Sequence, residues 1–331
     1  MVFRMRGLIM KVGIVGAGRV GCACALAAAV RGSARAIVLV DRTRKRAKAV
    51  ATDLRYGSPL CPKTTIVDGD YDDLADAALV MITAGINEKA GGATDRNDPE
   101  GRLRLLDKNA EIYRDIVPRV VGAAPGAVIL VVTDPPDPLA DIARACAGHD
   151  HVLSTGTFLD SLRFRAHLAE HFDVDANQVE AQVIGEHGTS QVFLWSTARI
   201  AGVMIDKLIE ERGEMSDKVR EQVENMVRYA NITIIEGNEA SQLGIGIVAA
   251  RIAEMVLRDE RAVIPIGSYN DKFGVTLSLP SVVGRGGVAR TFEPEMSREE
   301  QRALVSSAAR LKKREAEAEL PSSHRSLSSL L

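Results

Sequence analysis

The stretch LIMKVGIVGAGRVG, residues 8–21, decides the fold, because an apolar run leads directly into a glycine-rich turn. Gly16 permits the tight turn, Gly18 lets a diphosphate approach the backbone, and Gly21 allows a helix to pack closely on the preceding strand. The N terminus of that helix offers free N–H groups and a partial positive charge to phosphates. The order of strand, G-x-G-x-x-G turn and helix predicts a dinucleotide-binding fold.

A second apolar run, residues 36–40, ends at Asp41. A carboxylate at the end of the second strand accepts hydrogen bonds from the ribose hydroxyls of a dinucleotide and repels a 2′-phosphate. NAD is therefore expected as the cofactor. The basic residues that follow keep NADP open as an alternative, although such a run is usually a solvated helix face; they are Arg42, Arg44, Lys45 and Arg46.

The N-terminal half alternates short β-rich apolar runs with amphipathic stretches, which is typical of a parallel sheet covered on both faces. The expected strands are residues 8–15, 36–40, 64–67, 78–83 and 127–133, and the expected helices are residues 19–30, 42–56 and 102–122. Further elements are expected at residues 151–154, 157–171, 179–184, 216–257 (a long helical region), 262–266 and 275–279, with a final helix from residue 297. The fold class is thus α/β: a doubly wound Rossmann domain, residues 9–153, then an α+β substrate domain, residues 154–321. Residues 1–8 and 322–331 are expected to be flexible ends.

The composition favours an ordinary cytoplasmic enzyme over other classes. The 331 residues carry a formal net charge of −2, with 46% hydrophobic and 26% charged residues, so nothing points to nucleic acid or an anionic membrane as a partner. No apolar run reaches the ~18 residues of a membrane-spanning helix. The four cysteines show no metal-ligand spacing, and we expect neither a metal site nor disulfides.

Three segments carry groups suited to acid–base chemistry. His187 lies between glycines in GEHG, and GTFLDSLRFR, residues 156–165, places Asp160 and Arg163 on one helical face. The run RLRLLDKN opens a helix at Arg102, directly after a long polar loop at residues 86–101 of the kind that closes over active sites. A carboxylate–imidazole pair with two arginines is what hydride transfer to a 2-oxo acid requires: a proton donor, a group that stabilises charge on the carbonyl oxygen, and a grip on the carboxylate.

With these motifs, and with the ITAG of residues 82–85, the sequence resembles the L-lactate/malate dehydrogenase family, specifically its lactate-dehydrogenase-like branch, over residues 11 to about 313. The resemblance implies an NAD-dependent dehydrogenase of small L-2-hydroxy and 2-oxo acids that forms a homotetramer or homodimer. It implies His187 as general acid/base, Asp160 as its orienting carboxylate, Arg163 as the clamp on the substrate carboxylate, and Arg102 as the loop residue that polarises the carbonyl. It also implies cofactor contacts at Gly16, Gly18, Val20, Gly21, Asp41, Thr83, Ala84, Gly85, Asn109, Thr133 and Asp134.

The sequence departs from the family at the positions that set the substrate. Counting from ITAG places Glu88 at the specificity position, Asp134 replaces an asparagine, and Glu239 aligns with a pocket threonine. A buried unpaired carboxylate is costly, so three of them in one pocket predict a substrate with a cationic or strongly hydrogen-bonding side chain. Thr189 also replaces an aspartate that follows the GEHG motif.

Several alternatives stay open. If Glu88 faces solvent, Glu239 pairs with an arginine and Asp134 is protonated or hydrogen-bonded, the protein is an ordinary L-lactate dehydrogenase. Arg96 in the polar loop would make malate dehydrogenase a third possibility, and an inactive NAD-binding paralogue is a fourth. In some relatives a sugar bisphosphate activates through an arginine and a histidine; here these positions read Arg165 and Glu180, so we expect no such activation.

Overall fold

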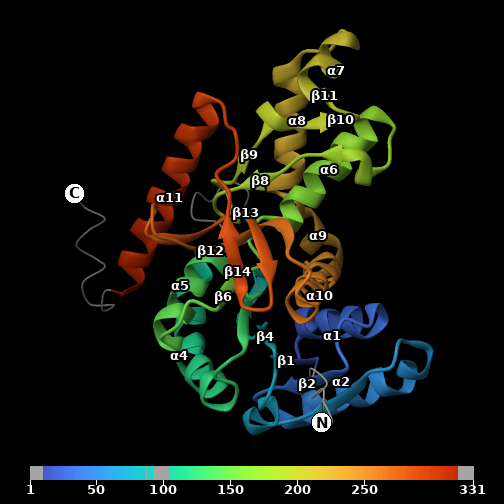
Figure 1. Ribbon diagram of the computed structural model, residues 1–331, viewed down its shortest axis with the longest axis vertical. Coiled ribbons are helices and arrows are strands. Elements are labelled where there is room, and N and C mark those ends of the chain that lie inside the picture. Colours follow the sequence, from blue (N-terminus) through green and yellow to red (C-terminus); the bar gives the residue numbers. More distant parts are fainter. Residues whose placement is uncertain (1–9, 87, 92–94, 96–103, 320–331) are drawn as a thin grey trace, which may run out of the picture.

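A nine-stranded sheet runs through both halves of the chain in the computed structural model, which describes residues 10–86, 88–91, 95 and 104–319 (Figure 1). The strand order is β14-β13-β12-β6-β5-β4-β1-β2-β3. The parallel strands are β1 Lys11–Val15, β2 Ala36–Val40, β3 Thr65–Asp68, β4 Leu79–Ile82, β5 Val128–Val131 and β6 Val152–Ser154. Strands β12 Ala262–Asn270, β13 Val275–Gly284 and β14 Gly287–Thr291 extend this sheet in antiparallel pairs.

Helices cover both faces of the parallel part, as a doubly wound fold requires. The helices are α1 Arg19–Arg31, α2 Arg44–Gly57, α3 Glu88–Gly91, α4 Leu106–Ala123, α5 Pro136–Ala147, α6 Phe158–Phe172, α7 Ile205–Glu211, α8 Ser216–Arg228, α9 Ala230–Asn238, α10 Leu243–Leu257 and α11 Arg298–Glu319. Short strands β7 Val179–Glu180, β8 Val183–Ile184, β9 Val192–Phe193, β10 Arg199–Ile200 and β11 Val203–Met204 complete the second half. The fold class is therefore the predicted one, a doubly wound Rossmann domain followed by a second half of helices and antiparallel strands.

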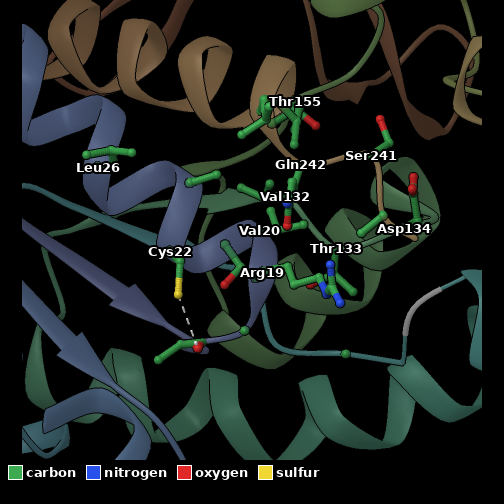
Figure 2. Close-up of a pocket in the computed structure, with 18 of the residues that line it drawn as sticks. Arg19, Val20, Cys22, Leu26, Val132, Thr133, Asp134, Thr155, Ser241 and Gln242 are labelled. Carbon is green, nitrogen blue, oxygen red and sulfur yellow. Dashed lines mark hydrogen bonds between the residues drawn. The ribbon is translucent and has the colours of Figure 1, made fainter. Parts of the chain in front are cut away.

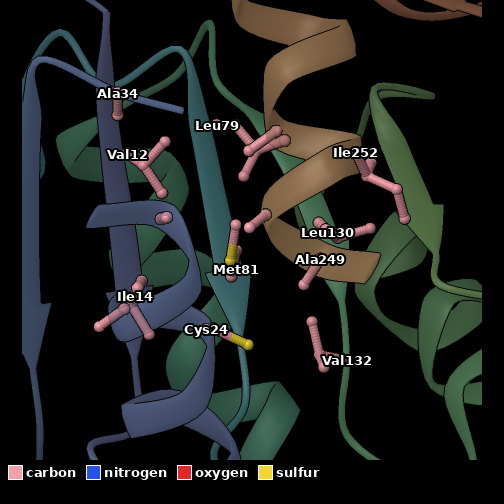
Figure 3. Close-up of a cluster of buried hydrophobic side chains, with 14 of the residues drawn as sticks. Val12, Ile14, Cys24, Ala34, Leu79, Met81, Leu130, Val132, Ala249 and Ile252 are labelled. Carbon is pink, nitrogen blue, oxygen red and sulfur yellow. The ribbon is translucent and has the colours of Figure 1, made fainter. Parts of the chain in front are cut away.

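Successive side chains of a strand point to opposite faces of the sheet, so the hydrophobic core is divided into one cluster on each face. On β4, Leu79 and Met81 join the cluster under α1 and α10 (Figure 3), whereas Val80 and Ile82 join the cluster under α4 and α5. Helices α1 and α10 approach so closely that a Cβ on Gly246 would lie 2.7 Å from the carbonyl carbon of Ala23. The second half of the chain thus supplies part of the core of the first.

A buried carboxylate also joins α1 to α10. Glu254 accepts hydrogen bonds from Arg31 (2.8 and 2.9 Å), Ser33 (3.0 Å) and Arg251 (2.9 Å). Burial raises the pKa of the Glu254 carboxyl, but these donors outweigh it and hold the pKa below its ordinary value.

The C-terminal elements differ most from the sequence expectations. The single helical region predicted for residues 216–257 is three helices, and α10 is bent by 118° from α9. The two predicted strands, residues 262–266 and 275–279, are longer and form the β12–β13 hairpin on the main sheet, and β14 had not been predicted. Polar and small residues in these strands, such as Ser268, Ser278 and Ser281, obscured the apolar pattern by which a strand is predicted from sequence. Within the described residues no single helix is long and apolar enough to span a membrane, and α9 with α10 meet that criterion only as a bent pair.

Candidate active site

A cavity of about 900 Å³ lies between the glycine turn and the second half of the chain. Figure 2 shows Asp134 and Ser241 toward one end of it and Cys22 and Leu26 toward the other. Its walls come from the ends of β1, β4 and β5, from α1, α2 and α6, and from the α9–α10 bend. Ligands of doubly wound folds bind at the carboxyl ends of the strands, which is where this cavity opens.

The glycine turn has the geometry that the motif predicts. Gly16 has a φ of 107°, in the region that favours glycine, and a Cβ on Gly21 would lie 1.9 Å from the Gly16 carbonyl oxygen. A Cβ on Gly18 would meet nothing within 4 Å, because Gly18 faces the cavity. The turn is braced from β4 by the Thr83 hydroxyl, which donates to the Gly16 carbonyl at 2.8 Å.

Asp41 closes the turn from the end of β2. Its carboxylate accepts hydrogen bonds from the backbone N–H groups of Ala17 and Thr43, each at 2.8 Å. Of the basic residues after it, Arg44 pairs with Asp68 and Asp70, whereas Arg46 lines the cavity. An acceptor at this position disfavours a 2′-phosphate, in agreement with the NAD expectation.

His187 stands in the loop between β8 and β9 with its imidazole at the cavity. The side chain is 12% exposed, and Nδ1 lies 2.5 Å from Oδ2 of Asp160, which is almost fully buried on α6. Arg163, one turn further along α6, donates to the other Asp160 oxygen at 3.1 Å and lines the cavity beside His187. The carboxylate fixes the tautomer with hydrogen on Nδ1, so Nε2 is the nitrogen that can exchange a proton with a ligand. The structure thus brings together the three predicted residues that it describes.

Two aspartates after β5, Asp134 in the turn and Asp137 in the first turn of α5, complete the surroundings of His187. Asp134 lines the cavity with Oδ1 3.7 Å from His187 Nε2. Asp137 is fully buried, accepts from the His187 backbone N–H at 2.6 Å and from the Ser154 hydroxyl at 2.5 Å, and burial raises the pKa of its carboxyl to about 7. Sequence reasoning gave Asp137 no role, although its place in the DPPD run, residues 134–137, was a usable signal.

Of the predicted cofactor residues, Gly18, Val20, Thr83, Gly85, Thr133 and Asp134 line the cavity. Asn109 is fully buried and acts as a brace: its side chain accepts from the Ile86 N–H and donates to the Asp134 carbonyl, both at 2.7 Å. Thr133 donates to the Ala84 carbonyl at 2.9 Å. These contacts hold the ends of β4 and β5 together at the cavity floor.

Glu239 is not among the described residues that line the cavity, although the resemblance to the family placed it in the pocket. Its side chain is 60% exposed at the end of α9 and pairs with Arg19 and with Lys89. Ser241, two residues on, lines the cavity instead, because the bend after α9 turns it inward. Ser241 and, from α9, the buried Asn231 are among the cavity-lining residues that were not predicted from the sequence.

The lid predictions fall mostly outside the described part of the chain. Arg102 and Arg96 lie outside the described residues, and so does the side chain of Glu88, whose backbone begins α3. Across residues 10–86, 88–91, 95 and 104–319, no group of three or more His, Cys, Asp or Glu side chains could hold a metal ion.

The described residues fit a dinucleotide. The open space before Gly18 and the uncapped start of α1 suit a diphosphate, and the cavity continues from there to His187. In agreement, residues 10–152 match the family model of the lactate/malate dehydrogenase NAD-binding domain. Residues 157–320 match that of the lactate/malate dehydrogenase alpha/beta C-terminal domain.

Whole-chain relatives agree with the family models. The chain is 43% identical to an L-lactate dehydrogenase of Deinococcus radiodurans over 300 residues, 90% of this chain and 96% of that one. It is 40% identical to that of Thermus aquaticus over 310 residues, 92% and 97% of the two chains. Among solved structures, a lactate dehydrogenase from a Medee basin deep-sea metagenome superimposes with a TM-score of 0.85 at 31% identity, covering 94% of this chain and 99% of that one. The chain therefore belongs to the lactate/malate dehydrogenase family and is an NAD-dependent oxidoreductase of 2-hydroxy acids.

Proposed function

We propose that the protein is an L-lactate dehydrogenase, which interconverts L-lactate and pyruvate with NAD. The observation that carries the proposal is the placing of His187, whose Nδ1 is bound by buried Asp160 and whose Nε2 is on the cavity side, next to Arg163. The choice of lactate is supported by the relatives named L-lactate dehydrogenase at 36–43% identity.

Each of these side chains has one task in the proposed reaction. NADH, when bound, supplies the hydride that reduces the carbonyl carbon. His187 gives the proton on Nε2 to the carbonyl oxygen, and takes it back when lactate is oxidised. Asp160 holds the ring and stabilises its imidazolium form, and Arg163 binds the substrate carboxylate through its planar guanidinium. The role of Arg102 in polarising the carbonyl stays a prediction from the resemblance.

The relatives favour lactate over the expected substrate with a cationic or polar side chain. That expectation needed three carboxylates in the pocket, and Glu239 does not line the cavity among the described residues. Asp134 does, 3.7 Å from His187 Nε2. A carboxylate there favours the imidazolium form and repels an anionic substrate, which modulates lactate dehydrogenase chemistry without replacing it.

Steady-state rates with a panel of 2-oxo acids test the proposal: pyruvate, oxaloacetate and an acid with an amino side chain, each with NADH and NADPH. Pyruvate with NADH is expected to give the highest kcat/KM. In Asp134→Asn the KM for pyruvate should fall by up to about fivefold, because two unit charges about 4 Å apart in water repel each other by about 1 kcal/mol and the variant removes one of them. Exposed Asp150→Asn is the matched control.

The other outcomes each identify a different enzyme. If the enzyme prefers the 2-oxo acid with an amino side chain, and if Asp134→Asn loses that preference, the substrate is cationic and not lactate. A preference for oxaloacetate would point to Arg96 and malate. NADH binding without any turnover would leave an inactive paralogue. Cytoplasmic location, a homotetramer or homodimer, and the absence of sugar-bisphosphate activation at Arg165 and Glu180 stay predictions.

A further inference from the structure

Glu239 joins three elements at the rim of the cavity. Its carboxylate at the end of α9 pairs with the guanidinium of Arg19, the first residue of α1, and lies 3.8 Å from the Lys89 ammonium on α3. All three side chains are more than half exposed, at 54%, 60% and 62% for Arg19, Glu239 and Lys89. This cluster is not part of the core, and ion pairs this exposed contribute little to stability.

Arg19 is the member that reaches the cavity. It extends from the glycine turn into the space that Figure 2 shows, beside Gly18 and Val20, which also line it. The start of α1 has no acidic residue in its first turn and no side-chain cap. Arg19 therefore adds a full positive charge to a helix start that already attracts anions, and in the described structure Glu239 supplies the anion.

The backbone gives no local reason for a glutamate at residue 239. Glu239 ends α9 in the left-handed region, with a φ of 59°, where glycine is the favoured residue. In this chain a charged side chain stands there in spite of that preference. Compared with glycine, the glutamate side chain adds the ion pairs with Arg19 and Lys89.

We propose that Arg19 is a ligand of the cofactor diphosphate and that Glu239 is its intramolecular competitor. Glu239 holds Arg19 before the cofactor binds and releases it to the diphosphate, while Lys89 remains as the second cation for Glu239. The exchange is favoured because an exposed ion pair contributes little, whereas a diphosphate offers several charged oxygens to one guanidinium. This inference rests on NAD binding, which the family establishes, and not on lactate as the substrate.

The competition predicts effects of opposite sign on NADH affinity, measured by nicotinamide fluorescence at fixed salt. Arg19→Met, which keeps the aliphatic stem, should weaken NADH roughly tenfold or more through loss of a charge-assisted contact. Glu239→Gln should tighten NADH about two- to fivefold, the scale of an exposed pair. The double variant should match Arg19→Met, because Glu239 acts through Arg19. Exposed Glu221→Gln on α8 is the matched control.

Three further measurements separate the diphosphate from other causes. ADP-ribose, which has the diphosphate but no nicotinamide, should show the same signs as NADH, and Arg19→Lys should fall between wild type and Arg19→Met. The salt dependence of NADH binding should be shallower in Arg19→Met, since one charge contact is gone.

A weaker NADH affinity in Glu239→Gln would overturn the competition, because Glu239 would then be holding Arg19 in its binding position. Unchanged affinity in both single variants would overturn the role of Arg19. The proposed function can fail separately. If the variants change NADH affinity as expected but the wild type turns over no pyruvate, only the lactate dehydrogenase activity is refuted. Wild type that binds no NADH would refute both.

Discussion

Asp137 offers a test of the buried surroundings of His187, because its charge should be costly in the folded protein. Burial raises the pKa of this carboxyl from 3.8 to about 7, against the opposing effect of its bonds from Ser154 and His187. The folded state therefore binds the proton more tightly than the unfolded chain. The resulting stability is fully present below pH ~3.8 and is lost as the pH rises toward 7.

These two pKa values fix the size of the effect. Between pH 5 and pH 8 the ionisation of Asp137 removes about 3 kcal/mol from the free energy of unfolding. Asp137→Asn has no charge to bury, and its amide can still accept from the His187 N–H and donate to the Ser154 hydroxyl. The variant should therefore become more stable relative to wild type as the pH rises.

Thermal unfolding of the cofactor-free protein at pH 5 and pH 8 measures this difference. With ~2.1 cal/mol/K of unfolding entropy per residue, the Tm of Asp137→Asn minus that of wild type should rise by roughly 4 °C between the two pH values. Asp150→Asn, which changes an exposed carboxylate, should show no such rise. If the Tm difference between Asp137→Asn and wild type stays constant with pH, the Asp137 carboxyl has the same pKa in the folded and unfolded states, and the argument from burial is wrong.

Three other variants test the catalytic pair, the α1–α10 contact and the glycine turn. Asp160→Asn should lower kcat at least ~10²-fold with unchanged NADH affinity, since the ring loses its orienting carboxylate; a loss below about tenfold would contradict that role. Although burial raises the pKa of Glu254, its donors lower it overall, so its contribution is present near neutral pH and is lost on acidification. Glu254→Gln should cost roughly 2–3 kcal/mol in urea unfolding at pH 7 and less at pH 4, and equal losses at both would refute this. Gly21→Ala places a Cβ 1.9 Å from the Gly16 oxygen and should abolish NADH binding, whereas Gly57→Ala, with open space, should leave it intact.

The N-terminal half could be predicted from sequence because its signals are local. The apolar run before Gly16 forms β1, and β2 has the predicted bounds. Gly21, the third glycine of the motif, packs so closely on the Gly16 carbonyl that there is no room for a Cβ. His187, Asp160 and Arg163 were predicted through motifs, and the structure brings them together at one end of the cavity. For the glycine turn and for β2, a short stretch of chain contains the physical reason for its own geometry, whereas the contact between His187 and Asp160 needs two separate elements to come together.

The C-terminal half and the pocket wall depended on tertiary structure. The resemblance to the family placed Glu239 in the pocket, but the 118° bend between α9 and α10 turns Ser241 inward and leaves Glu239 to pair with Arg19. Asp137 has its role only because folding buries its carboxyl under the backbone of a residue fifty positions away. The sequence by itself determined the nucleotide fold and the identity of the reactive groups, since periodicity, glycine sterics and side-chain chemistry are local. Only the tertiary structure decided which charges face the cavity, because that depends on how distant elements bend and pack.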